Sequence, residues 1–229
     1  MKKIIIILFL SVLFFQLSFG QKDLSGIYTN EAGMQIIIDG NLFYYRIPNA
    51  PEVGFIVFYN DTLAECTIKR IDKNFIEINS EPPWYKVINS LKLCQSIDTT
   101  ITSDSIKVSF AVPYDRSSLT ISLFTDEFKQ FDLNYSENNK SLMLPNNTKT
   151  ITFSVLPEAH LALHSPEGLF YGVLYYSSIK YDIGKHINRV EIEIPAIDNS
   201  FFEKYYVKGE YARVRQNKIE WKGETFVKK

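Results

Sequence analysis

Hydrophobic and polar residues alternate with a period of two through most of this chain, which is typical of β-strands with one buried face. Residues 190–194, Val-Glu-Ile-Glu-Ile, alternate without exception. Residues 34–47 contain two such runs on either side of Asp39-Gly40. Asp-Gly readily takes the positive φ angles of a two-residue turn, so this segment predicts a β-hairpin.

Further strand-like runs follow, separated by turn residues. After the hairpin they are predicted at 53–59, 63–71 and 75–79. Beyond residue 98 they are predicted at 106–112, 119–124, 128–133, 141–144, 150–156, 169–177 and 189–194. The first group predicts an antiparallel meander or small barrel, and the second, with its short strands and frequent turns, predicts a β-sandwich. Residues 83–96 fit both a helical face and a strand, so both alternatives stay open there.

The end of the chain repeats a feature of its beginning. Gly209-Glu210-Tyr211 precedes a second predicted hairpin, just as Gly26-Ile27-Tyr28 precedes the first. We therefore expect the last strands to return to the first meander. This gives an N-terminal β-meander domain at 21–97, completed by 203–229, with a β-sandwich domain at 98–202 inserted between them.

Two stretches resemble known families. Residues 26–47 contain G-x-Y and then an I-x-I, D-G, F-x-Y hairpin, and they resemble the first strands of lipocalin-like domains of secreted bacterial proteins. Tyr28 stands where the lipocalin G-x-W has its Trp. Residues 100–200 resemble immunoglobulin-like sandwiches in the number and spacing of their strands, without the Cys, Trp, Cys arrangement of true immunoglobulin domains. Such resemblances imply a fold and say little about function.

The first 20 residues have the features of a signal peptide. Lys2 and Lys3 precede an apolar run at 4–15, and Ser18-Phe19-Gly20 offers a cleavage site before Gln21. The apolar run is shorter than the roughly 20 residues that span a bilayer. We expect an exported chain, periplasmic or extracellular, with no transmembrane segment after cleavage.

Composition is that of a globular protein, with 45% hydrophobic residues and a net charge of −1 over 229 residues. The net charge is small because two oppositely charged parts cancel. Residues 204–229 carry eight basic and three acidic groups, while the part before them is acidic. The basic residues alternate with apolar ones, which favours solvated strand faces over a polyanion site, so we expect no nucleic-acid partner.

Export allows a disulfide between Cys66 and Cys94, but two free thiols fit equally well.

Catalytic motifs are missing from the chain. It has no G-x-S-x-G, H-E-x-x-H, Walker loop, G-x-G-x-x-G or C-x-x-C, and we expect no cofactor. Glu191 and Glu193 alternate with apolar residues on one strand, which indicates a solvated sheet surface. Asp104, Asp115 and Asp126 lie near turns, where short acids bond the backbone.

One histidine pair could bind a metal. On a helix, His160 and His164 would lie one turn apart and could share an ion with Glu158. In an extended segment the two imidazoles would stand about 13 Å apart, too far to chelate. The favoured interpretation is a connecting turn or short helix between sandwich strands, with two surface histidines.

Aromatic residues are the remaining candidates for binding. Trp84 and Tyr85 follow the stiff Pro82-Pro83, and an exposed ring there could stack on a sugar or pack against a protein. For the adjacent aromatic pairs of the chain in general, burial by the other sheet or by the other domain is the favoured alternative, and Trp84 is the strongest candidate for an exposed ring. The sequence therefore favours an exported all-β binding protein that recognises a glycan or a partner protein, rather than an enzyme.

Two other functions stay open, a small hydrolase with dispersed carboxylates and a lipocalin-like carrier of an apolar ligand. A flat aromatic strip would favour the glycan binder, and a large apolar cavity in the first meander would favour the carrier. A cleft with two facing carboxylates would favour the enzyme.

Overall fold

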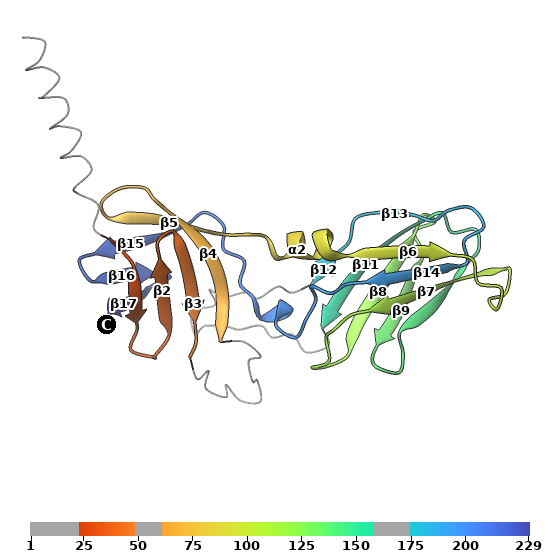
Figure 1. The fold of residues 1–229 in the computed structure, drawn as a ribbon, viewed down its shortest axis with the longest axis horizontal. Helices are drawn as coiled ribbons and strands as arrows, with labels where there is room; N and C mark the ends of the chain where they lie inside the picture. Colours follow the sequence, from red (N-terminus) through yellow and green to blue (C-terminus); the bar gives the residue numbers. More distant parts are fainter. Residues whose placement is uncertain (1–22, 49–60, 158–174) are drawn as a thin grey trace, which may run out of the picture.

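The computed structural model describes residues 23–48, 61–157 and 175–229, and nearly all of its regular structure is β-strand. Two all-β units lie end to end along the long axis, a barrel and a sandwich (Figure 1). The predicted all-β class is therefore confirmed. The strand predicted at 53–59 and most of the one predicted at 169–177 lie outside the described residues.

Eight strands form a closed barrel in the order β1-β17-β16-β15-β5-β4-β3-β2. Their bounds are Gly26–Thr29 (β1), Gln35–Asp39 (β2), Leu42–Arg46 (β3), Thr62–Arg70 (β4), Phe75–Ser80 (β5), Glu210–Arg215 (β15), Lys218–Trp221 (β16) and Glu224–Lys228 (β17). Strands from both ends of the chain thus share one sheet, and β1 pairs with β17 through Tyr28 and Lys228. Closure leaves this sheet without a free edge.

Two tight turns of the barrel differ from the sequence prediction. Asp39 pairs with Leu42, so the first turn consists of Gly40 and Asn41, one residue later than predicted. The second turn was missed together with β17. There Lys222 and Gly223 have φ angles of 50° and 80°, the pattern of a type I′ hairpin turn, and the chain folds back to close the barrel.

Aromatic side chains fill the inside of the barrel. The ring of Trp221 lies 5.3 Å from that of Phe43 and 5.3 Å from that of Tyr45, centroid to centroid. Phe226 packs against Tyr45 at 6.3 Å. An eight-stranded barrel is just wide enough to be filled by side chains, and these rings occupy that space.

Two sheets form the sandwich, ordered β10-β7-β14-β6 and β12-β11-β8-β9, with β13 beside β11. The bounds are Lys92–Ser96 (β6), Ser105–Ala111 (β7), Leu119–Thr125 (β8), Gln130–Tyr135 (β9), Ser141–Pro145 (β10), Thr150–Pro157 (β11), Tyr176–Ser177 (β12), Tyr181–Asp182 (β13) and Arg189–Glu193 (β14). Both sheets contribute to one core, where Phe110 of β7 meets Phe153 of β11 at 5.4 Å. The β7–β14 pair is parallel.

The ambiguous segment 83–96 contains both of its alternatives, helix α2 (Pro83–Ser90) followed by β6. Pro83 suits the first helical turn, which needs no N–H from it, and Val87 is buried in the sandwich core. β6 pairs with β14, so it belongs to the sandwich and not to the range 21–97 predicted for the first domain. Its partner strand lies far along the chain, where a local pattern cannot reveal it.

The two cysteines lie in different units. Cys66 is buried in the barrel, Cys94 is exposed on β6, and both are free. Burial raises the pKa of the Cys66 thiol to about 12. The disulfide that the sequence left open is therefore not formed.

We expect Phe226→Ala to lower the free energy of unfolding by about 3 to 5 kcal/mol, because it removes a buried ring from the strand that closes the barrel. Val227→Ala is the matched control on the same strand, where the side chain is 38% exposed, and it should cost about 1 kcal/mol or less. Urea unfolding followed by circular dichroism measures both. Equal losses would contradict the packing described for the barrel.

Thiol titration should distinguish the two cysteines. In the native protein near pH 8 a disulfide reagent should modify Cys94 quickly and Cys66 hardly at all, because the reagent needs an accessible thiolate. Both should react after unfolding in denaturant without reductant. An unfolded protein with no reactive thiol would show that a disulfide exists.

Candidate functional site

Within the described residues the chain crosses between the barrel and the sandwich twice, once after β5 and once before β15 (Figure 1). They meet where they leave the barrel, at Ser80 and Val207. The Ser80 N–H donates to the Val207 carbonyl at 2.8 Å, and the Val207 N–H donates to the Ser80 hydroxyl at 2.9 Å. The junction is therefore a pair of joined segments rather than one free linker.

The second crossing, residues 194–207, is the return segment, and it is anchored in both cores. Phe201 and Phe202 are buried in the sandwich core, while Tyr205 and Val207 are buried in the barrel core. The Tyr205 N–H also donates to the Leu63 carbonyl at 2.8 Å. Only two residues separate the two anchors, which leaves the units little freedom to move relative to each other.

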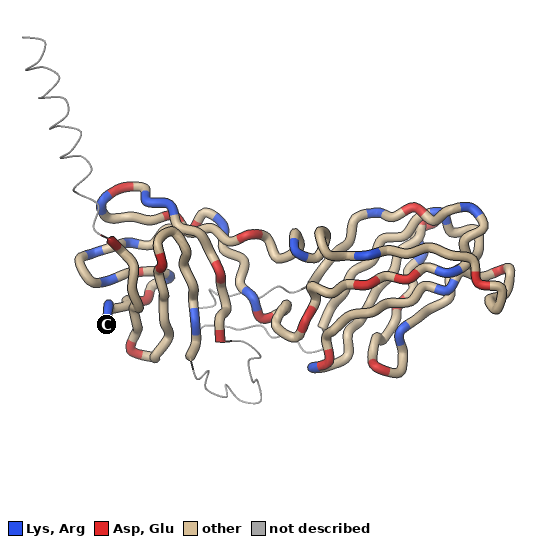
Figure 2. The backbone as a smooth tube through the Cα atoms, viewed as in Figure 1, with Lys and Arg blue, Asp and Glu red and all other residues tan. Residues whose placement is uncertain are grey.

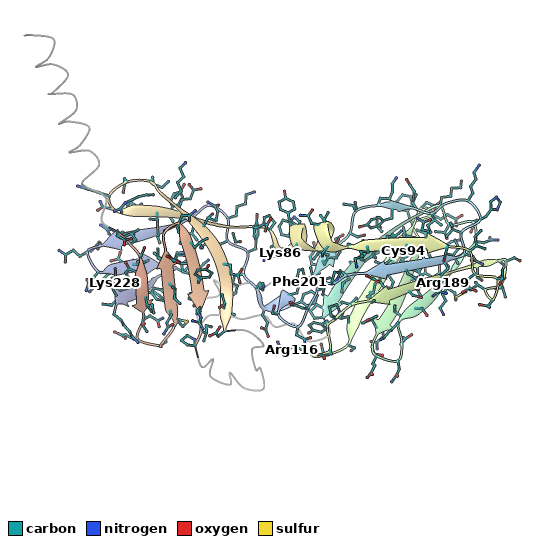
Figure 3. The ribbon with its side chains drawn as sticks, viewed as in Figure 1. Lys86, Cys94, Arg116, Arg189, Phe201 and Lys228 are labelled. Atoms are coloured by element: carbon teal, nitrogen blue, oxygen red, sulfur yellow. The ribbon has the colours of Figure 1, made fainter. Side chains whose placement is uncertain are left out.

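Polar contacts hold the return segment on the loop that precedes β8. The Asp115 N–H donates to the Asn199 side-chain oxygen at 2.9 Å, and the Asn199 amide donates to the Asp115 carboxylate at 2.6 Å. The Glu203 side chain is almost completely buried and forms an ion pair with Arg116. Figure 3 shows Arg116 and Phe201 close to this junction. A buried carboxylate is costly unless a cation accompanies it, so this ion pair ties the return segment to the sandwich loop.

A cleft of about 330 Å³ opens at the junction. We call it the junction cleft, and residues of both crossings and of β4 line it. Its charged lining residues are Glu65, Glu81, Lys86, Asp198 and Lys204. Ligand sites are frequent at interfaces between domains, and this volume lies at the lower end of their usual range.

The carboxylates of the junction cleft already have partners or face solvent. Glu65 lies 3.9 Å from the Lys86 ammonium, and both side chains are more than half exposed. Asp198 accepts hydrogen bonds from the backbone N–H and the hydroxyl of Ser200 at 2.9 and 2.8 Å. Glu81 is exposed. This arrangement offers hydrogen-bonding groups for a polar ligand, and the described residues that line the cleft include no buried acid.

Helix α2 presents a second surface beside the cleft. Trp84, Tyr85 and Ile88 are 40%, 50% and 36% exposed, and we call them the α2 patch. The Trp84 ring packs edge-on against Tyr206 of the return segment, with 4.9 Å between centroids and 64° between planes. Neither Trp84 nor Tyr85 lines the junction cleft, which takes Pro83 and Lys86 from this helix. The helix therefore presents its apolar patch and its cleft residues on different faces.

The proposed metal ligands His160, His164 and Glu158 lie outside the described residues. Within 23–48, 61–157 and 175–229 the structure contains no group of three or more His, Cys, Asp or Glu side chains that could hold a metal. No helix in the same ranges is long and apolar enough to cross a bilayer.

The other acidic residues considered in the sequence have structural contacts. Glu191 forms an ion pair with Arg189 at 2.7 Å, and Glu193 one with Lys92 at 3.1 Å. Asp126 accepts the Lys149 N–H, which lowers the pKa of its carboxyl. These contacts agree with surface and turn roles.

The sequence did not identify Ile88 as part of the α2 patch or Tyr206 as its neighbour. It also did not identify the acidic and basic residues of the junction cleft. Tyr206 follows Tyr205 directly, and such adjacent aromatic pairs were the one available signal. The cleft residues come from segments that are distant in the chain, and nothing in their local pattern brings them together.

No family model, no curated protein and no solved structure matches this chain.

Proposed function

We propose that this chain is an exported binding protein that recognises a partner protein through the α2 patch. The observation that carries the proposal is the exposure of Trp84, Tyr85 and Ile88 together on one short helix. Trp and Tyr are the residues most enriched among those that dominate binding energy at protein interfaces. The signal-peptide features of residues 1–20 support export.

The geometry of the rings favours a protein partner over a glycan at this patch. Trp84 and Tyr206 are inclined by 64°, so they do not make the flat strip on which a sugar chain would stack. A projecting Trp beside an aliphatic residue suits insertion into a pocket of another protein. The helix beneath is held by Val87 in the sandwich core, so little ordering would be needed on binding.

Glycan recognition is the second candidate, and the junction cleft favours it. Carboxylates and ammonium groups line a hollow of about 330 Å³, and the hydroxyl-bearing residues Thr62 and Ser80 lie among them. Such groups can hydrogen-bond sugar hydroxyls. Partnered or solvent-exposed carboxylates argue against a hydrolase, and the aromatic filling of the barrel argues against a carrier of a large apolar ligand.

Binding of the mature chain 21–229 to arrays of exported proteins and of glycans tests the proposal. For the protein that binds, we expect the double variant Trp84→Ala, Tyr85→Ala to raise the Kd at least about tenfold, because it removes the central apolar contacts. Tyr211→Ala is the matched control, an aromatic residue 60% exposed on β15 of the barrel, and it should leave the Kd unchanged.

Circular dichroism should show that the double variant keeps its fold. A Kd unaffected by the double variant, or lowered affinity in the Tyr211 control alone, would contradict the role of the α2 patch. Binding of a glycan only, sensitive to Lys204→Ala in the junction cleft, would favour the second candidate instead.

A further inference from the structure

A larger cleft lies at the end of the sandwich furthest from the barrel, and we call it the distal cleft. Three segments form it, 103–106 at the start of β7, 146–149 between β10 and β11, and 183–188 between β13 and β14. Its volume is about 540 Å³, well within the range of small-molecule sites.

Hydrogen bonds join the three segments to one another. The Asn146 side-chain amide donates to the Ser103 carbonyl at 2.9 Å, and the Ile183 N–H donates to the Lys149 carbonyl at 2.8 Å. Gln95 of β6 holds the third segment, accepting the Gly184 N–H at 2.8 Å. The walls of the distal cleft are thus held by hydrogen bonds and need little rearrangement to receive a ligand.

The titratable side chains that line the distal cleft all belong to basic residue types. They are Lys149, Lys185 and His186, and no acidic residue is among the lining residues. Figure 2 shows basic and acidic positions mixed on the loops at this end. Within the ranges that the structure describes, none of these three side chains has an ion pair.

Three acids near the distal cleft have contacts of their own. Asp104 accepts the Ser105 hydroxyl at 3.0 Å, and Asp98 forms an ion pair with Arg189 at 3.1 Å. Asp126 accepts the Lys149 backbone N–H at 2.9 Å, and the positive charge of Lys149 contributes to lowering the pKa of its carboxyl. None of these acids is among the residues that line the distal cleft, where the ionised side chains are lysines.

His186 has an unusual backbone conformation. Its φ is 66°, in the left-handed region, at the third position of a turn closed by the Ile187 N–H and the Gly184 carbonyl at 3.3 Å. A turn with positive φ at this position favours glycine, so an imidazole here is kept at a cost in backbone strain. The turn holds this side chain at the lining of the cleft.

We propose that the distal cleft binds the anionic group of a small ligand, a carboxylate, sulfate or phosphate. Lys149 and Lys185 supply positive charge, His186 adds a ring N–H donor, and no carboxylate is among the lining residues. Ile106 is buried and, with the partly buried Ile187, gives an apolar floor for the rest of the ligand. This site lies in other loops than the α2 patch, and its test is independent of the partner-protein proposal.

Titration of the mature chain 21–229, followed by backbone amide NMR shifts, tests this proposal with four probes: glucuronate, glucose 6-phosphate, inorganic sulfate and neutral glucose. At least one anion should saturate with a Kd below about 1 mM at low salt, shift amides of 103–106, 146–149 and 183–188, and weaken as salt rises. Glucose should not bind. A sugar acid or sugar phosphate that binds tighter than sulfate identifies an anionic saccharide, and the reverse identifies a free oxyanion.

Variants make the test specific. The double variant Lys149→Ala, Lys185→Ala should weaken anion binding at least about tenfold. Lys140→Ala should leave it unchanged, because this exposed lysine lies in the turn between β9 and β10, outside the cleft lining. His186→Gly should weaken binding without lowering the melting temperature, since glycine relieves the positive φ.

The proposal is overturned if no anion saturates with a Kd below about 1 mM. Equal weakening by the Lys140 variant and by the double variant would overturn it too, because binding would then follow net charge rather than the cleft.

Discussion

Four buried side chains within seven residues, Phe201, Phe202, Tyr205 and Val207, fix the barrel against the sandwich. The barrel is closed by strands from both ends of the chain, so the chain has to leave it once and return once. A return through a flexible linker would let the two units move independently. Here the returning residues are inserted into one core and then, after only two positions, into the other. The buried pair of Glu203 and Arg116 ties the same segment to the sandwich loop.

Both surfaces of the junction depend on this arrangement. The junction cleft is lined from β4 and from both crossings, so its shape exists only while the units keep their orientation. Helix α2 is held on the sandwich by Val87, and its Trp84 reaches across to Tyr206 of the return segment. A partner bound to the α2 patch would thus contact a rigid platform, which reduces the entropy lost on binding. The distal cleft depends instead on loop contacts within the sandwich.

Much of the fold could be predicted from local patterns. Period-two alternation located most of the strands, and the repeated Gly-x-Tyr suggested that the C-terminal strands return to the first sheet. β17 was missed because the tight turn at Lys222 and Gly223 carries no strong turn signal beyond one glycine. β6 was assigned to the wrong unit because its partner, β14, is distant in sequence. Trp84 could be proposed from its neighbouring prolines, whereas its contact with Tyr206 and both clefts arise only from tertiary packing.

The relative orientation of barrel and sandwich in solution tests the central claim most directly. Residual dipolar couplings of backbone amides, measured on weakly aligned protein of residues 21–229, give an alignment tensor for each unit. Anchoring of the return segment in both cores predicts that one tensor, with one magnitude and one set of axes, fits the barrel strands and the sandwich strands together. Two tensors of different magnitude would show that the units reorient independently, and would contradict a rigid junction.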